Sequence, residues 1–323
     1  MLTRRLPAAL LARLRAALPP GAALAYHDSD APMPRAELLT ACAGASALLC
    51  TLSDAVDEEL VRAAGASLRV VSTMSVGYSH CDVAALRAAR ARLGHTPGVL
   101  TDATADLVLG LLLATSRRIV EAAAAARSGA WAAWQPFWMT GKELSGARVG
   151  VIGMGRIGAA VARRLRGFGC EVVYDGRSGA KPELDAALGT RWLPRAELLA
   201  SSDFVVCVCA LTAETRGMLG AAAFAQMRDD VVFVNASRGE VVDQPALLAA
   251  LEARPRMRAG LDVCSPEPLP LDHPLLAHPR CLVLPHIGSA GERCRERMAE
   301  LMVDNALAAL AGDGAPMPAE VAL

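Results

Sequence analysis

Residues 148–158 read R-V-G-V-I-G-M-G-R-I-G, and this stretch decides the fold. Its apolar first part predicts a buried strand, and the alanine-rich residues 159–165 predict a helix. The glycines between them have G-x-G-x-x-G spacing. Gly153 allows the tight turn from strand to helix, Gly155 lets a pyrophosphate approach the backbone, and Gly158 lets the helix lie close to the strand. The free N–H groups and the positive dipole end of such a helix attract phosphate.

The segment after this helix supports the same interpretation. Residues 171–174 predict a second apolar strand, which ends at Asp175. In dinucleotide-binding folds an acid about 20 positions after the first glycine holds the adenosine ribose. The context on both sides therefore favours dinucleotide binding over a glycine turn in some other βαβ protein.

The composition excludes several function classes. The chain has 323 residues, which predicts about two domains, and 53% of them are hydrophobic. Lys+Arg and Asp+Glu number 33 each, so bulk charge gives no reason to expect a nucleic-acid or membrane partner. The aromatic residues are too few for base stacking. The longest apolar block, residues 107–114, is far shorter than the ~20 residues of a membrane span.

The cysteines and the N-terminus bear on the compartment. The nine cysteines are scattered, and an odd number in a long chain predicts free thiols in a reducing compartment, so we expect a cytoplasmic protein. The pair Cys207 and Cys209 lacks C-x-x-C spacing. Residues 1–18 hold four arginines and no acid, as mitochondrial transit peptides do. Their leucines have helical spacing, however, which favours a short strand and helix of the folded protein.

Strands and helices alternate along most of the chain, and the strands of the second half are continuous apolar runs, which predict a parallel sheet covered on both faces. The sequence thus predicts an α/β fold with two doubly wound parallel-sheet domains, the larger a Rossmann dinucleotide-binding domain. Strands are expected at 47–52, 68–73, 204–208, 231–235, 260–263 and 281–284, and helices at 54–64, 81–92, 104–128 and 292–311.

Three residues whose side chains could take part in catalysis follow successive strands of the larger sheet: Arg238, Glu267 and His286. Ligands of parallel sheets bind beyond the carboxyl ends of the strands, so these residues are site candidates. The arginine fork suits a carboxylate and a carbonyl oxygen. The histidine can give or take a proton near neutral pH, and a neighbouring glutamate would fix its tautomer and favour its charged form.

Singly, each of these residues has an ordinary structural explanation: a surface ion pair for Arg238, a histidine bonded to a backbone carbonyl for His286, a solvated loop residue for Glu267. Together they fit the reduction of a 2-keto acid. Arg238 would bind the carboxylate and polarise the keto oxygen, His286 would protonate that oxygen as hydride arrives from a nicotinamide, and Glu267 would keep His286 charged. No H-E-x-x-H or equivalent cluster predicts a metal site.

Residues 131–138 read W-A-A-W-Q-P-F-W and hold three of the four tryptophans. A core helix seldom needs such a density of large rings. Two interpretations stay open: an arm that packs on another subunit, or a segment that packs on its own domain.

The motifs resemble the signatures of the D-isomer-specific 2-hydroxyacid dehydrogenases, and within that family the glyoxylate/hydroxypyruvate reductases. The family signatures are residues 153–158, 236–239, 260–263 with 267–268, and 284–288; the features of the narrower group are 72–77, 100–104, 131–138, 265–270 and 273–276. The resemblance implies reduction of glyoxylate to glycolate and of hydroxypyruvate to D-glycerate. It also implies a homodimer in which Trp134 reaches the partner's active site.

The resemblance further implies the domain boundaries and the remaining site residues. Residues 1–100 plus 290–323 would form the substrate-binding domain, and 101–289 the NAD(P)-binding domain. Val76 and Gly77 would offer N–H groups to the substrate carboxylate. The other substrate residues would be Leu52, Trp134, Arg238, His286 and Ser289. The cofactor residues would be Thr104, Gly153, Gly155, Arg156, Ile157, Gly158, Asp175, Arg177, Ser178, Cys209, Ala236, Asp262 (near the nicotinamide amide) and Gly288.

The choice of cofactor has signals in both directions. Asp175 would accept a hydrogen bond from a ribose 2′-OH and repel a 2′-phosphate, at a cost of at least ~1 kcal/mol within ~4 Å, which favours NAD(H). Arg177 and Ser178 favour NADP(H), as does the overall resemblance, so NADP(H) is the narrow preference and NAD(H) the alternative.

Besides the cofactor signals, the sequence departs from the family pattern at its first strand, and two rival functions remain. The first strand has only Met1–Thr3, which predicts a weak sheet edge or a true start further upstream. A phosphoglycerate dehydrogenase type is the first rival; the tryptophan segment and the lack of a C-terminal regulatory domain argue against it. A dinucleotide-sensing corepressor on the same fold is the second; neutral charge and the lack of interaction tails argue against it.

Overall fold

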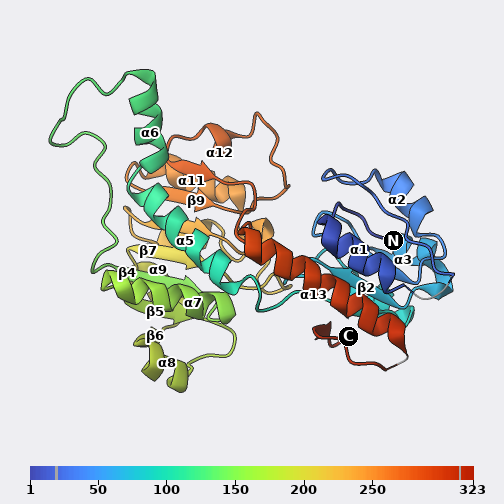
Figure 1. Ribbon diagram of the computed structural model, residues 1–323. Coiled ribbons are helices and arrows are strands. Elements are labelled where there is room, and N and C mark those ends of the chain that lie inside the picture. Colours follow the sequence, from blue (N-terminus) through green and yellow to red (C-terminus); the bar gives the residue numbers. More distant parts are fainter. Residues whose placement is uncertain (19–20, 313) are drawn as a thin grey trace. The chain divides into compact units, whose positions relative to one another are not determined.

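The computed structural model describes residues 1–18, 21–312 and 314–323. The chain divides into two compact units, one formed by Met1–Leu100 with Ala290–Leu323 and the other by Thr101–Ser289 (Figure 1). Parallel strands alternate with helices in both units, so the predicted α/β class is confirmed.

The larger unit is built on a seven-stranded parallel sheet with strand order β10-β9-β8-β7-β4-β5-β6. The strand order reverses between β4 and β7, and such a reversal is where α/β sheets bind their ligands. The strands are β4 (Arg148–Ile152), β5 (Glu171–Asp175), β6 (Thr190–Trp192), β7 (Phe204–Cys207), β8 (Val232–Asn235), β9 (Arg258–Leu261) and β10 (Cys281–Val283).

Helices cover both faces of this sheet, as the continuous apolar strands predicted. Val149 and Val151 of β4 pack with α5 and α7, while Ile152 packs with α9, α10 and α11. The helices are α5 (Thr101–Ser116), α6 (Ile119–Ser128), α7 (Arg156–Leu165), α8 (Pro182–Leu188), α9 (Arg195–Ser201), α10 (Ala221–Gln226), α11 (Gln244–Ala253) and α12 (Pro274–Ala277).

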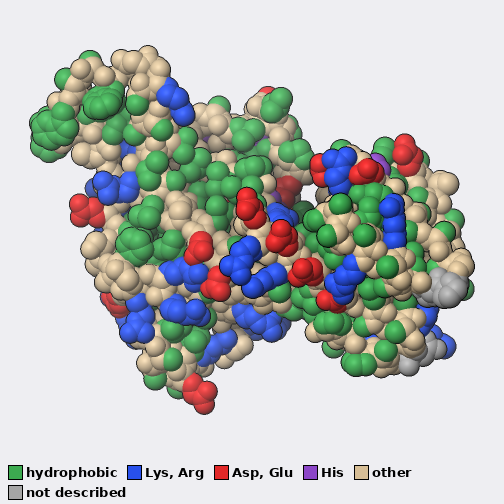
Figure 2. All heavy atoms as spheres, in the orientation of Figure 1, with side chains coloured by type: hydrophobic (Ala, Val, Ile, Leu, Met, Phe, Trp, Pro, Cys, Tyr) green, Lys and Arg blue, Asp and Glu red, His purple; other side chains and the backbone are tan. Residues whose placement is uncertain are grey.

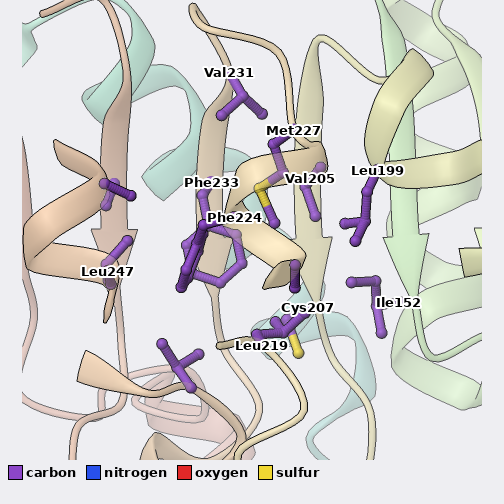
Figure 3. Packing of buried hydrophobic residues seen from close by; sticks show 14 of the residues in the cluster. Ile152, Leu199, Val205, Cys207, Leu219, Phe224, Met227, Val231, Phe233 and Leu247 are labelled. Carbon is purple, nitrogen blue, oxygen red and sulfur yellow. The ribbon is translucent and has the colours of Figure 1, made fainter. Parts of the chain in front are cut away.

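Figure 3 shows the core on the α10 side of the sheet. Phe233 of β8 and Phe224 of α10 are both buried, and their rings meet edge to face with centroids 5.6 Å apart. This packing fixes β8, whose carboxyl end leads into the segment that carries Arg238.

The smaller unit has a four-stranded sheet with order β1-β2-β3-β11. Its first three strands are parallel, and β11 adds an antiparallel edge. The long helix α13 packs against β1 and β2, so the C-terminal segment completes this unit. The elements are β1 (Ala47–Cys50), β2 (Val70–Thr73), β3 (Arg92–Gly94), β11 (Glu320–Val321), α1 (Ala8–Ala16), α2 (Arg35–Cys42), α3 (Glu58–Ala64), α4 (Val83–Ala88) and α13 (Glu292–Ala311).

Several predicted boundaries were wrong. The single helix expected over 104–128 is two helices, because Arg118 adopts a left-handed conformation with φ +56° between α5 and α6. The helix expected from residue 54 begins at Glu58, since the carboxylate of Asp57 caps it by accepting from Leu60 N–H. The helix expected over 81–92 ends at Ala88, and the next residues form β3. Strand β6 was missed.

The N-terminal helix forms as the leucine spacing predicted, and α1 buries Leu10 and Leu14. Before it, Leu2 makes parallel bridges to Tyr26 and Leu49, although no full strand forms there. All nine cysteines are free thiols, as expected. Among the described residues, no helix is long and apolar enough to cross a membrane.

The aromatic pair in the core gives a test of the fold. Phe233→Ala removes a fully buried ring and leaves a cavity, so the free energy of unfolding should fall by about 3–5 kcal/mol. Urea unfolding followed by circular dichroism measures this change. Phe168→Ala, at a partly exposed ring, should cost less than about 1 kcal/mol. Equal losses in the two variants would contradict the assigned packing.

Candidate active site

The glycine turn after β4 has the geometry of a phosphate-binding turn. Gly153 has φ +103°, and a Cβ there would lie 2.6 Å from the Cα of Cys209, which follows β7. A Cβ at Gly158 would lie 2.1 Å from the Gly153 carbonyl oxygen. Both positions therefore require glycine for close approach of backbone.

Gly155 differs from these two glycines. A Cβ built on it meets nothing within 4 Å, and its φ of −85° suits any residue. It is the N-cap residue of α7, whose first N–H groups have no partner within the helix. Open space at a helix N-terminus, in a place where the fold itself does not demand glycine, fits a dinucleotide pyrophosphate.

The candidate adenosine end lies at the carboxyl end of β5. The Asp175 backbone carbonyl accepts from Gly153 N–H at 2.8 Å, and its buried carboxylate accepts from Arg195 Nε at 2.7 Å. Arg177 and Ser178 are exposed in the turn that follows. Sequence reasoning missed Arg195; its one available signal is its position at the start of the helix after the next strand, β6.

The other proposed cofactor positions lie near the carboxyl ends of the strands of this sheet. Arg156 and Ile157 begin α7, and Ala236 N–H donates to the Cys207 carbonyl at 3.0 Å. A Cβ on Gly288 would lie 3.4 Å from the Thr104 side chain, so α5 and the segment after β10 are in contact there.

Arg238 is held by a polar turn at the end of β8. The Asn235 side chain accepts from Ser237 N–H and donates to the Arg238 carbonyl, at 3.1 Å each. A Cβ on Gly239 would lie 1.9 Å from the Cys264 carbonyl oxygen, so this turn packs closely on the segment after β9. The Arg238 guanidinium donates to the Ser237 carbonyl at 2.7 Å through Nη1 only.

Glu267 and His286 meet directly. His286 Nδ1 lies 2.8 Å from Glu267 Oε2, and Glu267 Oε1 accepts from Cys264 N–H at 2.9 Å. With both of its oxygens bonded, the carboxylate orients the ring. His286 Nε2 has no hydrogen-bond partner among the described residues and is available to a ligand.

Asp262 fixes the backbone that carries His286. Its two carboxylate oxygens accept from Ile287 N–H and Gly288 N–H, at 2.8 Å each, and its carbonyl accepts from His286 N–H at 2.9 Å. His286 itself has φ +54°, an unusual left-handed conformation. Three hydrogen bonds to one residue thus stabilise a conformation that a histidine rarely adopts.

The charges of the site act on one another. Burial acts to raise the pKa of Glu267, but the hydrogen bond and charge of His286 outweigh it, and the pKa lies below its usual value. Glu267 is therefore a carboxylate at neutral pH. Burial lowers the pKa of the Arg238 guanidinium, and the charges of Glu267 and Glu240 act against this. Burial raises the pKa of Asp262 despite its backbone donors.

Gln244 is a second residue that sequence reasoning missed. Its side-chain amide donates to the Ser265 carbonyl at 2.6 Å and accepts from Ser265 N–H at 2.9 Å. This two-point contact anchors the loop on which Glu267 lies. A glutamine at the start of a helix has no local pattern that would reveal this contact.

The remaining predicted residues are less tied to the site. In the smaller unit, Leu52 is half-buried in the turn after β1. The carbonyls of Val76 and Gly77 bond to His95 Nδ1 and Ser75 Oγ, while their N–H groups donate to no described residue. In the larger unit, Ser289 is half-buried, and Trp134 is 80% exposed on the loop after α6.

Comparisons with known proteins agree with this geometry. Residues 109–288 match the model of the D-isomer specific 2-hydroxyacid dehydrogenase NAD binding domain. Glyoxylate reductase/hydroxypyruvate reductase of Homo sapiens is 46% identical over 322 residues, 99% of this chain and 97% of the relative. A crystal structure of a protein from Thermus thermophilus superposes with a TM-score of 0.89 at 44% identity, covering 99% of both chains.

A third relative was solved with ligands. The NADPH-dependent glyoxylate/hydroxypyruvate reductase of Sinorhizobium meliloti, in complex with NADP and malonate, has a TM-score of 0.84 at 29% identity over 99% of this chain and 95% of its own.

The fold and the site define an oxidoreductase that uses a nicotinamide dinucleotide. The chain belongs to the family of D-isomer specific 2-hydroxyacid dehydrogenases. The predicted family is therefore confirmed.

The open space at Gly155 gives a test of cofactor binding. Gly155→Ala places a methyl group where the pyrophosphate would approach and keeps the phosphate away from the first N–H groups of α7. The affinity for the dinucleotide should therefore fall about 10- to 100-fold, as expected for loss of a hydrogen bond to a charged group. Isothermal titration calorimetry measures the affinity. Gly110→Ala, in α5 and also without neighbours, is the matched control and should bind normally. Normal binding by Gly155→Ala would place the pyrophosphate elsewhere.

Proposed function

We propose that this chain reduces glyoxylate to glycolate and hydroxypyruvate to D-glycerate with NAD(P)H. The observation that carries the proposal is the histidine–carboxylate pair: His286 Nδ1 is bonded to Glu267, and Nε2 is available. The similarity to reductases named for these substrates, from Homo sapiens and Sinorhizobium meliloti, supports the substrate class.

The chain's own residues divide the chemistry between them. The dinucleotide, when bound, supplies the hydride for the keto carbon. Arg238 binds the substrate carboxylate and polarises the keto oxygen with a guanidinium whose Nη2 has no other described partner. His286 Nε2 gives its proton to the keto oxygen, and Glu267 stabilises the charged ring before that transfer. The C–O double bond thereby becomes an alcohol.

The two units have separate roles in this proposal. The larger unit, with the glycine turn and β5, binds the dinucleotide and also carries Arg238 and His286, and the smaller unit adds backbone N–H groups for the substrate carboxylate. The N–H groups of Val76 and Gly77 support the second role, because they are free within the described residues and suited to an anion. Leu52 and Ser289 complete the substrate residues, and Thr104, Cys209, Ala236, Asp262 and Gly288 the cofactor residues.

NADPH is the proposed preferred cofactor, with NADH as the alternative. Arg177 and Ser178 are exposed beside Asp175 and available to a 2′-phosphate. The reductase of Sinorhizobium meliloti is NADPH-dependent, which supports this preference.

The proposed compartment is reducing and cytoplasmic, consistent with nine free thiols.

A homodimer is the proposed assembly. Trp134 and Phe137 are 80% and 87% exposed, so these two rings do not pack on their own unit. Figure 2 shows hydrophobic side chains gathered over the loop after α6, at the upper left. Such a patch is typical of an interface, and in this proposal Trp134 reaches the partner's active site.

The role of His286 as general acid is tested with a substitution that can adopt the same backbone conformation. Asparagine tolerates the left-handed conformation at 286, so His286→Asn should fold normally. Its kcat for glyoxylate and hydroxypyruvate should fall about 10²- to 10⁴-fold, since the general acid is lost. His278→Asn, at a histidine outside the site, should keep full activity. Near-normal turnover by His286→Asn would overturn the assignment.

The glutamate gives a pH-dependent prediction. Reduction needs the protonated ring, and the Glu267 carboxylate stabilises that form. In Glu267→Gln the decline of kcat/KM with rising pH should therefore begin at a lower pH, because the ring loses the carboxylate bonded to its Nδ1. Glu240→Gln, which removes a charge near Arg238 without touching His286, should keep the original profile. Identical profiles for the two variants would remove Glu267 from this role.

The dimer is tested through its proposed contact residues. Trp134→Ser combined with Phe137→Ser should convert the protein from dimer to monomer, because the interface no longer buries two large apolar rings. Analytical ultracentrifugation measures the mass. Phe168→Ser, at another partly exposed ring, should remain dimeric. A monomeric unmodified protein would contradict the assembly.

A further inference from the structure

The acid at the end of β5 is paired with an arginine. Asp175 occupies the position at which an unpaired carboxylate would accept from a ribose 2′-OH and repel a 2′-phosphate. Here the carboxylate is buried, and its Oδ2 accepts from Arg195 Nε at 2.7 Å. A guanidinium in direct contact neutralises most of the negative charge that a phosphate would meet.

Arg195 is placed for this contact by the fold. It is the first residue of α9, and Leu198 and Leu199 of the same helix are buried in the core with Val173 of β5. The helix is thus fixed against the strand that ends at Asp175. The arginine position follows from tertiary packing and not from a flexible loop.

The Arg195 guanidinium has N–H donors that are available to a ligand. It bonds to Asp175 through Nε alone, and its Nη1 and Nη2 bond to no other described residue. The side chain is 43% exposed, whereas that of Asp175 is 11% exposed. A planar fork can bind one anion through one edge and a second anion through the other.

Other cations belong to the same region. Arg177 is exposed two residues after Asp175, and Lys181 Nζ donates to the Met154 carbonyl of the glycine turn at 2.8 Å. Arg156 is exposed at the start of α7. Among the acids, Asp175 is paired with Arg195, Asp185 accepts from Thr190 and Glu214 accepts from Thr212. The cations therefore keep donors for an additional phosphate.

We propose that Arg195 determines the cofactor preference: it neutralises Asp175 and donates through its Nη groups to the 2′-phosphate of the adenosine. The inference rests on the proposed use of a nicotinamide dinucleotide and adds a residue to it. Asp175 alone would select NADH; the pair of Asp175 with Arg195 selects NADPH. The acid therefore does not decide the preference by itself.

Adenosine 2′,5′-bisphosphate and AMP are probes for this site, and isothermal titration calorimetry measures their affinities without catalysis. The unmodified protein should bind the bisphosphate more tightly. Arg195→Gln should weaken the bisphosphate and NADPH about 10- to 100-fold and change AMP and NADH less than about threefold, since only the 2′-phosphate loses a charged donor. Arg195→Lys, which keeps the charge, should retain part of the preference.

Arg191→Gln is the matched control. It removes the same charge from a nearby arginine that pairs with Glu171, at the opposite end of β5 from Asp175, and should leave all four affinities unchanged. The double variant Arg195→Gln with Asp175→Asn should recover the part of the bisphosphate affinity that is lost to repulsion, because the neutral amide no longer repels the phosphate. This recovery separates neutralisation from a merely structural role.

Three results would overturn the inference. The first is an equal loss for AMP and the bisphosphate in Arg195→Gln, the second is no loss for either, and the third is no recovery in the double variant. Failure of the unmodified protein to bind any of the four nucleotides would instead overturn the proposed function itself.

Discussion

The site depends on the three hydrogen bonds that Asp262 accepts from the segment after β10. Its carboxylate binds Ile287 N–H and Gly288 N–H, and its carbonyl binds His286 N–H. These contacts hold His286 in a left-handed conformation, and in that conformation its ring meets Glu267. Without them the backbone at 286 would relax to a common conformation, and the ring would leave the carboxylate. A buried aspartate thus sets the geometry of the residue proposed to move the proton.

Much of the fold could be predicted because its signals are local. Positions 153 and 158 have no room for a side chain, so their glycines mark the turn in the sequence. The central strands are fully buried and read as apolar runs. Strands β3 and β6 have three residues each and no such run, and their pairing comes from neighbouring strands. The break at Arg118 is a left-handed arginine, for which no local residue pattern exists.

The candidate site divides in the same way. Arg238 and His286 follow strands, so the topology rule for parallel sheets predicted their neighbourhood. Their roles remain predictions until the variants are measured. Arg195 and Gln244 could not be found, because each acts on a partner about 20 positions away through a contact that only the folded chain creates. Asp175 shows the consequence: its position in the sequence suggests a free acid, and the structure shows one that is paired.

The account's central claim is that this site delivers a hydride and a proton to a small 2-keto acid. The most direct test is chiral chromatography of the product formed from hydroxypyruvate and NADPH, with NADH in parallel. The account predicts glycerate of the D configuration, one molecule for each NADPH oxidised. L-glycerate, or no glycerate with either cofactor, would contradict it.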